Sequence, residues 1–219
     1  RPGVTSSAVA PDGSPVAVFA ALPAEPGAGY VLGALGPACD VLELGCGAGR
    51  LTRALVAAGH RVVAVDESAA MLAEVGPGAG RVVADATALS LGRRFDAVVL
   101  ASYLVNDRAR GHAFLGVAAA HLRPGGRAVV QRYDPVWAET GEPGEAVAGP
   151  VTIAVERLTP HDGWFAATVA YTLEGRRWAQ EVEGAILDDA ALGAMAAGAG
   201  LRVAAWLDAH RTWAVLTRP

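Results

Sequence analysis

The segment GCGAG at positions 45–49 is the part of the chain most suited to chemistry. A short apolar run, Val41 to Leu44, precedes it, and a segment with helical spacing, Arg50 to Ala58, follows it. Glycines between a strand and a helix let the backbone turn tightly and approach a ligand without Cβ clashes. The helix start adds free backbone N–H groups. Alone, this glycine-rich loop is a weak signal, since ligand-free turns and dinucleotide sites share it.

Two acidic side chains follow the next two apolar runs. Asp66 ends the run that begins at Arg61, about 20 residues after the loop, and Asp85 follows the run 81–84. A carboxylate at the first position can accept hydrogen bonds from both hydroxyls of a ribose, and one at the second from an adenine amino group. In isolation each also fits an ordinary role, a helix N-cap for Asp66 and a loop residue for Asp85. Three such features at three successive strand ends favour an adenosyl ligand.

A parallel sheet is needed to bring these groups together. Near-continuous apolar runs alternate with helical segments as far as Gln131, which is typical of a parallel α/β sheet covered on both faces. After Tyr133 the pattern changes: residues 134–149 predict a loop, and three alternating runs within 151–187 predict an antiparallel meander. A helix at 188–199 and a final antiparallel pair of strands complete the predicted elements.

Five segments carry a family resemblance. VLELGCGAGR, VVAVDESAAML, VVADATAL, FDAVVLAS and LRPGGRAVV resemble, in this order, the motifs of class I S-adenosylmethionine-dependent methyltransferases of the small actinobacterial type. The resemblance is close over residues 37–133, and the chain is also similar to amino-sugar and glycine N-methyltransferases. It implies a Rossmann-like, seven-stranded, doubly wound α/β sheet with an antiparallel last hairpin and a three-stranded antiparallel insertion at about 150–187. Residues 1–36 would form an arm and helices over the cofactor, and residues 37–219 the methyltransferase domain.

The resemblance also implies roles at the donor site. The glycine-rich loop would hold the methionine part of S-adenosylmethionine, Asp66 the ribose, and Asp85 the adenine edge. Ala101 and Ser102 would face the amino group and the sulfonium of the donor. The predicted donor-binding residues are Glu43, Gly45, Cys46, Gly47, Gly49, Asp66, Glu67, Met71, Asp85, Ala86, Ala101 and Ser102. The N-terminal segment 11–15 is expected to close over the donor.

The acceptor is expected at the carboxyl ends of the fourth and fifth strands, because methyl transfer is an in-line displacement that needs an aligned nucleophile. The predicted substrate-binding residues there are Tyr103, Asn106, Arg132 and Trp137. Arg132 would bind a carboxylate or phosphate of the acceptor. Tyr133 and Asp134 are the candidates for a catalytic base. Each of these residues alone also fits ordinary loop chemistry.

Composition excludes several other classes of function. The net charge is −4 and the cationic residues do not cluster, which argues against a nucleic-acid surface. No apolar run reaches the roughly 18 residues of a membrane span. Two cysteines predict no disulfide framework and a cytoplasmic location, and five scattered histidines predict no metal site. His112 and His121 are expected on the surface, and His210 far from the acceptor site.

Together these features predict transfer of a methyl group to an O or N atom of a small molecule, in secondary metabolism, with S-adenosylhomocysteine as the product. Two alternatives stay open: a protein that binds S-adenosylmethionine without methyl transfer, and an NAD-type oxidoreductase. Glu43 ahead of the loop, in the pattern E-x-G-x-G-x-G, argues against the oxidoreductase. A homodimer formed through the meander is one arrangement that the sequence allows.

Overall fold

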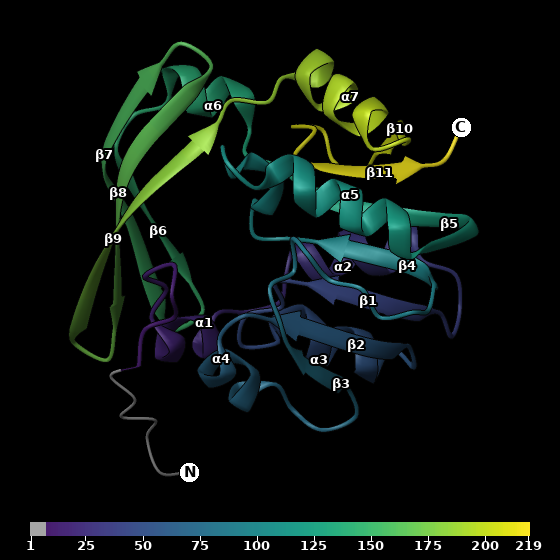
Figure 1. The fold of residues 1–219 in the computed structure, drawn as a ribbon. Coiled ribbons are helices and arrows are strands. Elements are labelled where there is room, and N and C mark those ends of the chain that lie inside the picture. Colours follow the sequence, from purple (N-terminus) through teal and green to yellow (C-terminus); the bar gives the residue numbers. More distant parts are fainter. Residues whose placement is uncertain (1–7) are drawn as a thin grey trace.

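A seven-stranded sheet forms the larger part of the structure, a computed structural model that describes residues 8–219 (Figure 1). Its strands are β1 (Asp40–Leu44), β2 (Arg61–Asp66), β3 (Gly80–Val83), β4 (Phe95–Leu100), β5 (Leu122–Gln131), β10 (Arg202–Trp206) and β11 (Trp213–Thr217). They lie in the order β10-β11-β5-β4-β1-β2-β3. Strands β1 to β5 are parallel, and β11 is antiparallel to both neighbours. The predicted sheet and its antiparallel last hairpin are confirmed.

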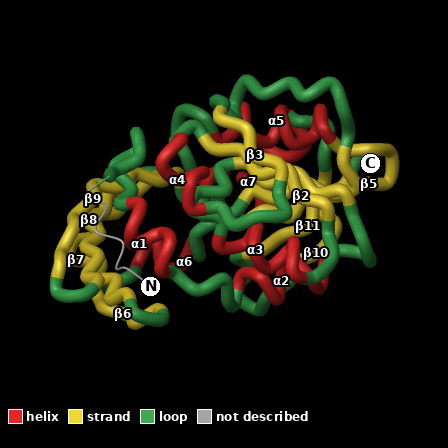
Figure 2. Tube along the Cα trace, turned by 90° about the horizontal axis from the view of Figure 1, so that it is seen from below, coloured by secondary structure: helices red, strands yellow, loops and turns green. Residues whose placement is uncertain are grey.

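Helices cover both faces of this sheet (Figure 2). They are α2 (Gly27–Ala34), α3 (Arg50–Ala57), α4 (Ala69–Glu74), the 3-10 turn η1 (Leu104–Asn106), α5 (Gly111–His121) and α7 (Asp189–Gly198). Val31 and Leu51 bring α2 and α3 onto one face, and Phe114 and Leu192 bring α5 and α7 onto the other. All five residues of β1, including Asp40 and Glu43, are buried, because both faces of a central parallel strand are covered.

A second sheet of four antiparallel strands stands opposite the carboxyl ends of β1, β2 and β4 (Figure 1). Its strands are β6 (Gly144–Ala148), β7 (Val151–His161), β8 (Trp164–Leu173) and β9 (Arg176–Ala185). Three of them match the predicted meander. The fourth, β6, and the helix α6 (Pro135–Thr140) occupy the segment 134–149, for which the prediction of a loop is wrong.

The N-terminal residues join the two sheets. In helix α1 (Val16–Ala21), Val16 packs with Met71 of α4, whereas Val18 packs with Val151 and Tyr171 of the second sheet. Ahead of α1, the backbone oxygen of Asp12 accepts a hydrogen bond of 2.8 Å from Gln180 of β9. Of the predicted N-terminal arm, residues 1–7 lie outside the described residues.

Across residues 8–219, the structure contains no helix with both the length and the apolar character that crossing a membrane requires.

Candidate functional site

The carboxyl ends of the parallel strands bring the predicted donor residues to one edge of the seven-stranded sheet. Leu44, the last residue of β1, pairs with Val65 of β2 and with Leu100 of β4. The glycine-rich loop therefore lies between the ends of β2 and β4. Asp66 pairs with Val83 at the end of β3, so the Asp85 segment lies on the far side of Asp66. An elongated adenosyl ligand can lie along this row, as ligands of open α/β sheets do.

The glycine-rich loop itself has the tight backbone that was predicted. Gly45 and Gly49 have φ values of +63° and +79°. A Cβ atom at Gly45 would lie 2.6 Å from Leu104 Cδ1, and one at Gly49 would lie 3.1 Å from the backbone Cα of Val75. Within residues 8–219, no side chain caps the N-terminus of α3, so its first N–H groups are free for an anionic group of a ligand.

Asp66 ties this loop to the end of β2. Its Oδ2 accepts a hydrogen bond from the backbone N–H of Gly47 at 2.8 Å, and its Oδ1 accepts one from Ser68 at 2.9 Å. Burial raises the pKa of Asp66, while the two hydrogen bonds oppose that shift. Each carboxylate oxygen keeps a second lone pair, so the side chain can still accept from ribose hydroxyls.

The other predicted donor residues lie around the same edge. Glu67 pairs with Arg110 at 3.5 Å, and Asp85 Oδ1 accepts hydrogen bonds from the Thr87 hydroxyl at 2.7 Å and the Thr87 N–H at 2.8 Å. These hydrogen bonds lower the pKa of Asp85 and keep the carboxylate ionised. Four further predicted donor residues are buried: Cys46, Met71, Ala86 and Ala101.

Glu43 is a buried carboxyl beneath the loop. It is 2% exposed, and its Oε2 accepts a hydrogen bond of 2.5 Å from the Thr52 hydroxyl of α3. Burial is the main cause that raises the pKa of Glu43 to about 7, above its usual 4.5. The side chain therefore joins β1 to α3, the two elements that flank the loop, and titrates near neutral pH.

The variant Glu43→Gln is expected to flatten the dependence of stability on pH. The folded-state pKa of Glu43 is raised to about 7, so the protonated carboxyl stabilises the folded chain. This contribution to the free energy of unfolding is fully present below pH 4.5 and is lost as the pH rises through 7. The loss in the wild-type chain is roughly 3 kcal/mol. The glutamine side chain of the variant cannot titrate and can still accept from Thr52. Urea unfolding at pH 5 and pH 8.5 measures the difference, with Glu139→Gln at an exposed site as the control. Equal pH slopes in wild type and Glu43→Gln would contradict this assignment.

A strained turn follows β4. Ser102 and Tyr103 both have positive φ values, +54° and +63°, which few residues other than glycine adopt. The backbone N–H of Ser102 donates to Gln131 Oε1 at 2.9 Å, so the side chain at the end of β5 holds the backbone of this turn. Such strain persists where the surroundings enforce it, and it is concentrated at functional sites.

This turn places Tyr103 in an aromatic group, together with Tyr133, Trp137 and Phe165. The rings of Tyr103 and Tyr133 stack with centroids 3.9 Å apart, and Phe165 of β8 meets Tyr133 edge-on at 5.0 Å. Trp137 of α6 stacks on Tyr133 from 5.8 Å. Three of the predicted acceptor-site residues are thus brought together. Burial raises the pKa of Tyr133 far above its usual range, so its phenol stays protonated at neutral pH.

Arg132 does not reach the acceptor region, and its predicted role in binding substrate is wrong. Its side chain is 1% exposed, and all three nitrogen atoms are engaged. They donate to the backbone oxygens of Arg211 and Leu187 and to Asp189, at 2.8, 2.5 and 2.6 Å. Arg132 therefore joins the last hairpin to the segment before α7.

Asn106 and Asp134 also have structural partners. Asn106 is 1% exposed, donates to the Ala185 backbone oxygen at 2.8 Å and accepts from the Tyr133 N–H at 3.1 Å, so its predicted contact with substrate is wrong. Asp134 caps α6 through Oδ1, which accepts from the N–H of Val136 at 2.9 Å. Its role as a base stays a prediction.

Two expectations for histidines are also wrong. His121 is 4% exposed, and its Nε2 accepts a hydrogen bond from the Leu91 N–H at 3.2 Å. His210 lies close to the acceptor side, with Nδ1 3.4 Å from Asp134 Oδ2. His112 is exposed as expected.

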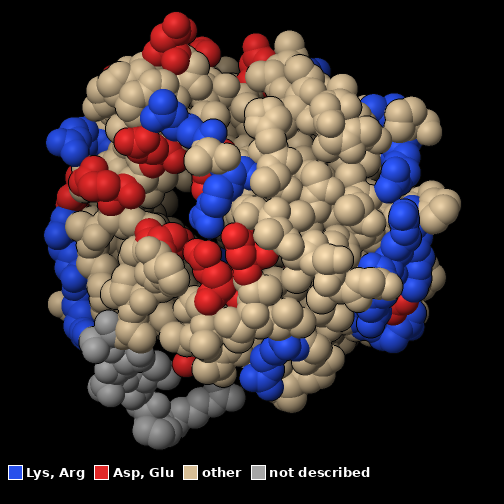
Figure 3. Space-filling model, in the orientation of Figure 1, with Lys and Arg blue, Asp and Glu red and all other residues tan. Residues whose placement is uncertain are grey.

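A hollow opens between the two sheets in the space-filling view, with carboxylate and guanidinium groups gathered around it (Figure 3). The carboxyl ends of the parallel strands face the second sheet on this side of the molecule (Figure 1). The donor residues and two of the aromatic rings, Tyr103 and Tyr133, thus lie at the same edge of the seven-stranded sheet, and Phe165 reaches Tyr133 from the second sheet.

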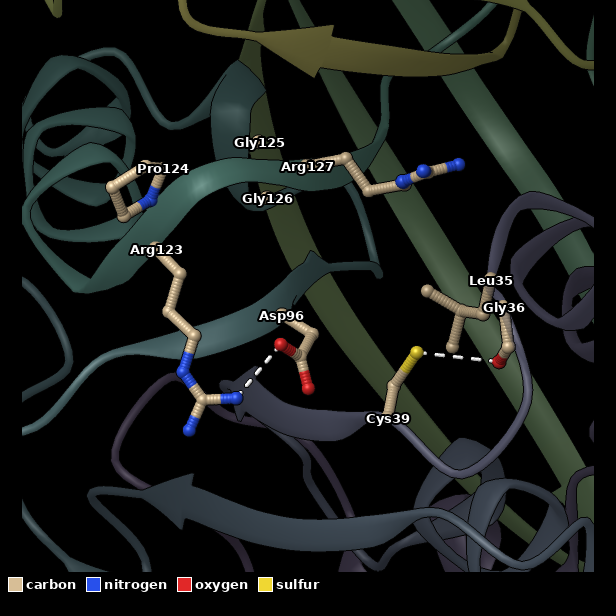
Figure 4. A pocket seen from close by; sticks show the side chains of 9 residues that line it. All are labelled: Leu35, Gly36, Cys39, Asp96, Arg123, Pro124, Gly125, Gly126 and Arg127. Atoms are coloured by element: carbon tan, nitrogen blue, oxygen red, sulfur yellow. Dashed lines mark hydrogen bonds and ion pairs between the residues drawn. The ribbon is translucent and has the colours of Figure 1, made fainter.

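A separate pocket of about 210 Å³ lies at the opposite end of β1 from the glycine-rich loop (Figure 4). Arg123 pairs there with Asp96 and with Asp40, each at 2.7 Å, and the Cys39 thiol donates to the Gly36 backbone oxygen at 3.2 Å. These three ionic groups satisfy one another, and Arg127, which also lines the pocket, donates to the backbone oxygen of Ala34 at 2.8 Å.

A known family model matches the part of the chain that contains the glycine-rich loop, Asp66 and Asp85. Residues 41–126 match the family model described as a methyltransferase domain. The predicted resemblance to class I methyltransferases is thereby confirmed for the part of the chain that carries the donor residues. No curated protein matches the chain at a significant level.

Solved structures share the fold of most of the chain. An S-adenosylmethionine-dependent methyltransferase from Clostridium acetobutylicum is 16% identical, with 87% of this chain and 90% of that chain covered and a TM-score of 0.71. CalS10 from Micromonospora echinaspora, an amino pentose methyltransferase solved with S-adenosylmethionine, is 24% identical over 90% of each chain, with a TM-score of 0.68. KedS8 from Streptoalloteichus, a sugar N-methyltransferase, is 20% identical over 91% and 87% of the chains, with a TM-score of 0.66. The chain therefore shares the fold of these structures over 87–91% of its length.

Two residues at the site were given no individual role by the sequence. Gln131 holds the turn after β4, and Arg50, the first residue of α3, points its guanidinium toward Ser102. Arg50 follows the last glycine of the loop directly, so its position next to the donor site is a signal that the sequence contains.

Proposed function

We propose that this chain transfers the methyl group of S-adenosylmethionine to an amine nitrogen of a small molecule such as an amino sugar. One observation supports S-adenosylmethionine as the methyl donor. The backbone at Gly45 and Gly49 forms a cradle that a Cβ atom would fill, and this cradle lies beside the carboxylate of Asp66. These residues fit an adenosyl donor. The acceptor half is supported by the descriptions of CalS10 and KedS8, which share the fold and are an amino pentose methyltransferase and a sugar N-methyltransferase.

When bound, the donor supplies a methyl group activated by a sulfonium charge. The chain has to align the acceptor nitrogen with that methyl group, since the new N–C bond forms as the S–C bond breaks. The stacked rings of Tyr103 and Tyr133 offer a flat surface for the acceptor at the ends of β4 and β5. Aromatic faces and nearby carboxylates both attract a cationic amine.

A protonated amine must lose a proton before it attacks. Asp134 and His210, whose closest side-chain atoms lie 3.4 Å apart at the end of β5, are the proposed proton acceptors. Tyr133 is proposed to position the acceptor, because its buried phenol does not ionise at neutral pH.

The variant Tyr133→Phe is expected to keep kcat within a few-fold of wild type and to leave its pH profile unchanged. Tyr133→Ala removes the ring that stacks on Tyr103, so it is expected to raise KM for the acceptor. Steady-state kinetics from pH 6 to pH 9 measure both effects. A fall in kcat of roughly 100-fold or more in Tyr133→Phe would instead show that the phenol is a base.

The proposed function is tested with purified protein, S-adenosylmethionine and paired acceptors that differ only in an amino or a hydroxyl group. We expect S-adenosylhomocysteine to form, and one methyl group to be added, with the amino member of a pair. Turnover only with the hydroxyl members would contradict nitrogen as the acceptor atom. Binding of S-adenosylhomocysteine without turnover across the panel would favour a binding protein, and binding of NAD alone would favour an oxidoreductase.

A further inference from the structure

Gly184, a buried residue of β9, lies directly across from Phe165 of β8 in the second sheet. Its φ is outside the left-handed region, so the backbone conformation does not require glycine here. A Cβ atom at this position would lie 2.6 Å from Cε1 and 2.7 Å from Cζ of Phe165, and 3.4 Å from Cε2 of Tyr133. Glycine is therefore needed at position 184 because an aromatic ring occupies the place of a side chain.

The backbone on both sides of this contact is held in place. Asn106 donates from Nδ2 to the Ala185 backbone oxygen at 2.8 Å and accepts from the Tyr133 N–H at 3.1 Å. The antiparallel ladder pairs Gly184 itself with Phe165. A side chain at position 184 would therefore displace the end of the Phe165 ring more easily than the strand.

The Phe165 ring in turn helps to set the position of the Tyr133 ring. The two rings meet at an angle of 90° with centroids 5.0 Å apart, an arrangement that aromatic pairs favour. No hydrogen bond within residues 8–219 holds the Tyr133 hydroxyl, since the group of Tyr133 that donates is its backbone N–H. The ring is thus placed by its aromatic neighbours, which are Phe165, Trp137 and Tyr103.

We propose that Gly184 is a positioning residue for the acceptor, an assignment that rests on the proposed function. Because position 184 has no side chain, the ring of Phe165 can lie against β9 and hold Tyr133 edge-on. Tyr133 then stacks on Tyr103 and completes the flat surface proposed for the acceptor. Gly184 acts through these rings and does not touch the acceptor itself.

The test adds one methyl group at this position. Gly184→Ala is expected to raise KM for the amino acceptor of the paired panel about tenfold, with kcat within about threefold of wild type. The affinity for S-adenosylhomocysteine should stay within about twofold, because Gly184 and Phe165 belong to the second sheet and not to the donor edge. Steady-state kinetics and isothermal titration calorimetry measure these values. Near-UV circular dichroism of the ligand-free protein should lose intensity in the tyrosine region, because the packing of the rings changes.

Two further variants separate the ring contact from a general effect of alanine in a strand. Gly144 of β6 lies in the same sheet, is exposed, and a Cβ atom there would meet only the Glu142 backbone oxygen at 4.0 Å. Gly144→Ala should therefore match wild type in all three measurements. Leucine at position 165 lacks the two ring atoms that a Cβ at position 184 would meet. In a Phe165→Leu background, adding Gly184→Ala should change the acceptor KM by less than about twofold.

An unchanged acceptor KM and an unchanged near-UV spectrum in Gly184→Ala would overturn the proposal. A raised KM with an equal loss of affinity for S-adenosylhomocysteine would also overturn it, because that result indicates general loosening. If Gly184→Ala does not fold, Phe165→Leu tests the same contact: a raised acceptor KM supports the proposal, and an unchanged KM overturns it. Failure of the wild-type chain to methylate any amino acceptor would refute the proposed function, and the near-UV spectra would then report ring packing alone.

Discussion

Replacing Gly49 with alanine is expected to destabilise the folded chain by about 3 kcal/mol. The residue has a φ of +79°, which costs a side chain about 1–2 kcal/mol. A Cβ atom would also lie 2.9 Å from Val75 Cγ2 and 3.1 Å from the Val75 Cα, so the backbone around Val75 would have to move. Urea unfolding measures the loss, and calorimetry with S-adenosylhomocysteine should show weaker binding as the loop shifts.

Gly59 provides the matched control for this prediction. It follows α3 with a φ of +88°, and a Cβ atom there would meet no other described atom within 4 Å. Gly59→Ala should therefore lose only the free energy needed to hold alanine at a positive φ, about 1 kcal/mol. Its affinity for S-adenosylhomocysteine should stay unchanged. If the two variants lose the same stability, close approach to Val75 is not what requires glycine in the loop.

Replacing Asp66 with alanine is expected to weaken the binding of S-adenosylhomocysteine by roughly 100-fold, and by no less than tenfold. The carboxylate is proposed to accept hydrogen bonds from the ribose, and it also holds the N–H groups of Gly47 and Ser68 in place. Calorimetry measures the affinity, and affinity equal to wild type would contradict the ribose assignment.

A second ligand separates the ribose contact from the support of the loop. Methylthioadenosine and its 2′,3′-dideoxy analogue differ only in the two hydroxyls that Asp66 would bind. If Asp66 binds the ribose, the wild-type chain prefers the hydroxylated ligand and Asp66→Ala removes most of that preference. If both ligands weaken equally in Asp66→Ala, the carboxylate acts only through Gly47 and Ser68. Asp66→Asn keeps the shape of the side chain without its charge, so its preference for the hydroxylated ligand should lie between those of wild type and Asp66→Ala.

The donor side could be predicted from sequence because its residues are fixed by backbone geometry. A buried parallel strand appears in the sequence as a run of apolar residues. The residue that follows this run lies at the edge of the sheet where ligands bind. Asp66 and the glycine-rich loop follow such runs directly, so knowing the strands was enough to place them next to each other. The structure has both at this edge, joined by the hydrogen bond from Gly47 to Asp66.

The acceptor side could not be predicted in the same way. A polar residue after a strand looks the same in the sequence whether it meets a ligand or a distant part of the chain. Arg132 binds the backbone near Leu187 and Arg211, and Asn106 binds the backbone of Ala185. These partners lie 55 or more residues away, and only the packing of the second sheet and the last hairpin brings them together.

Of the two elements in segment 134–149, helix α6 could have been predicted from the sequence and strand β6 could not. Asp134 followed by Pro135 is a typical helix start, with a capping carboxylate and a proline in the first turn, and it marks α6. Strand β6 has no such mark, because four of its five residues are exposed and it is held by backbone pairing with β7. No alternation of apolar and polar residues reveals a strand of this kind.

The short helix α1 touches the donor side through Val16 and the second sheet through Val18, two residues apart in one rigid turn. A shift of α1 on one side is therefore a shift on the other. Any increase in acceptor affinity that the donor produces through α1 must be matched by an equal increase in donor affinity produced by the acceptor, since coupling free energies are reciprocal.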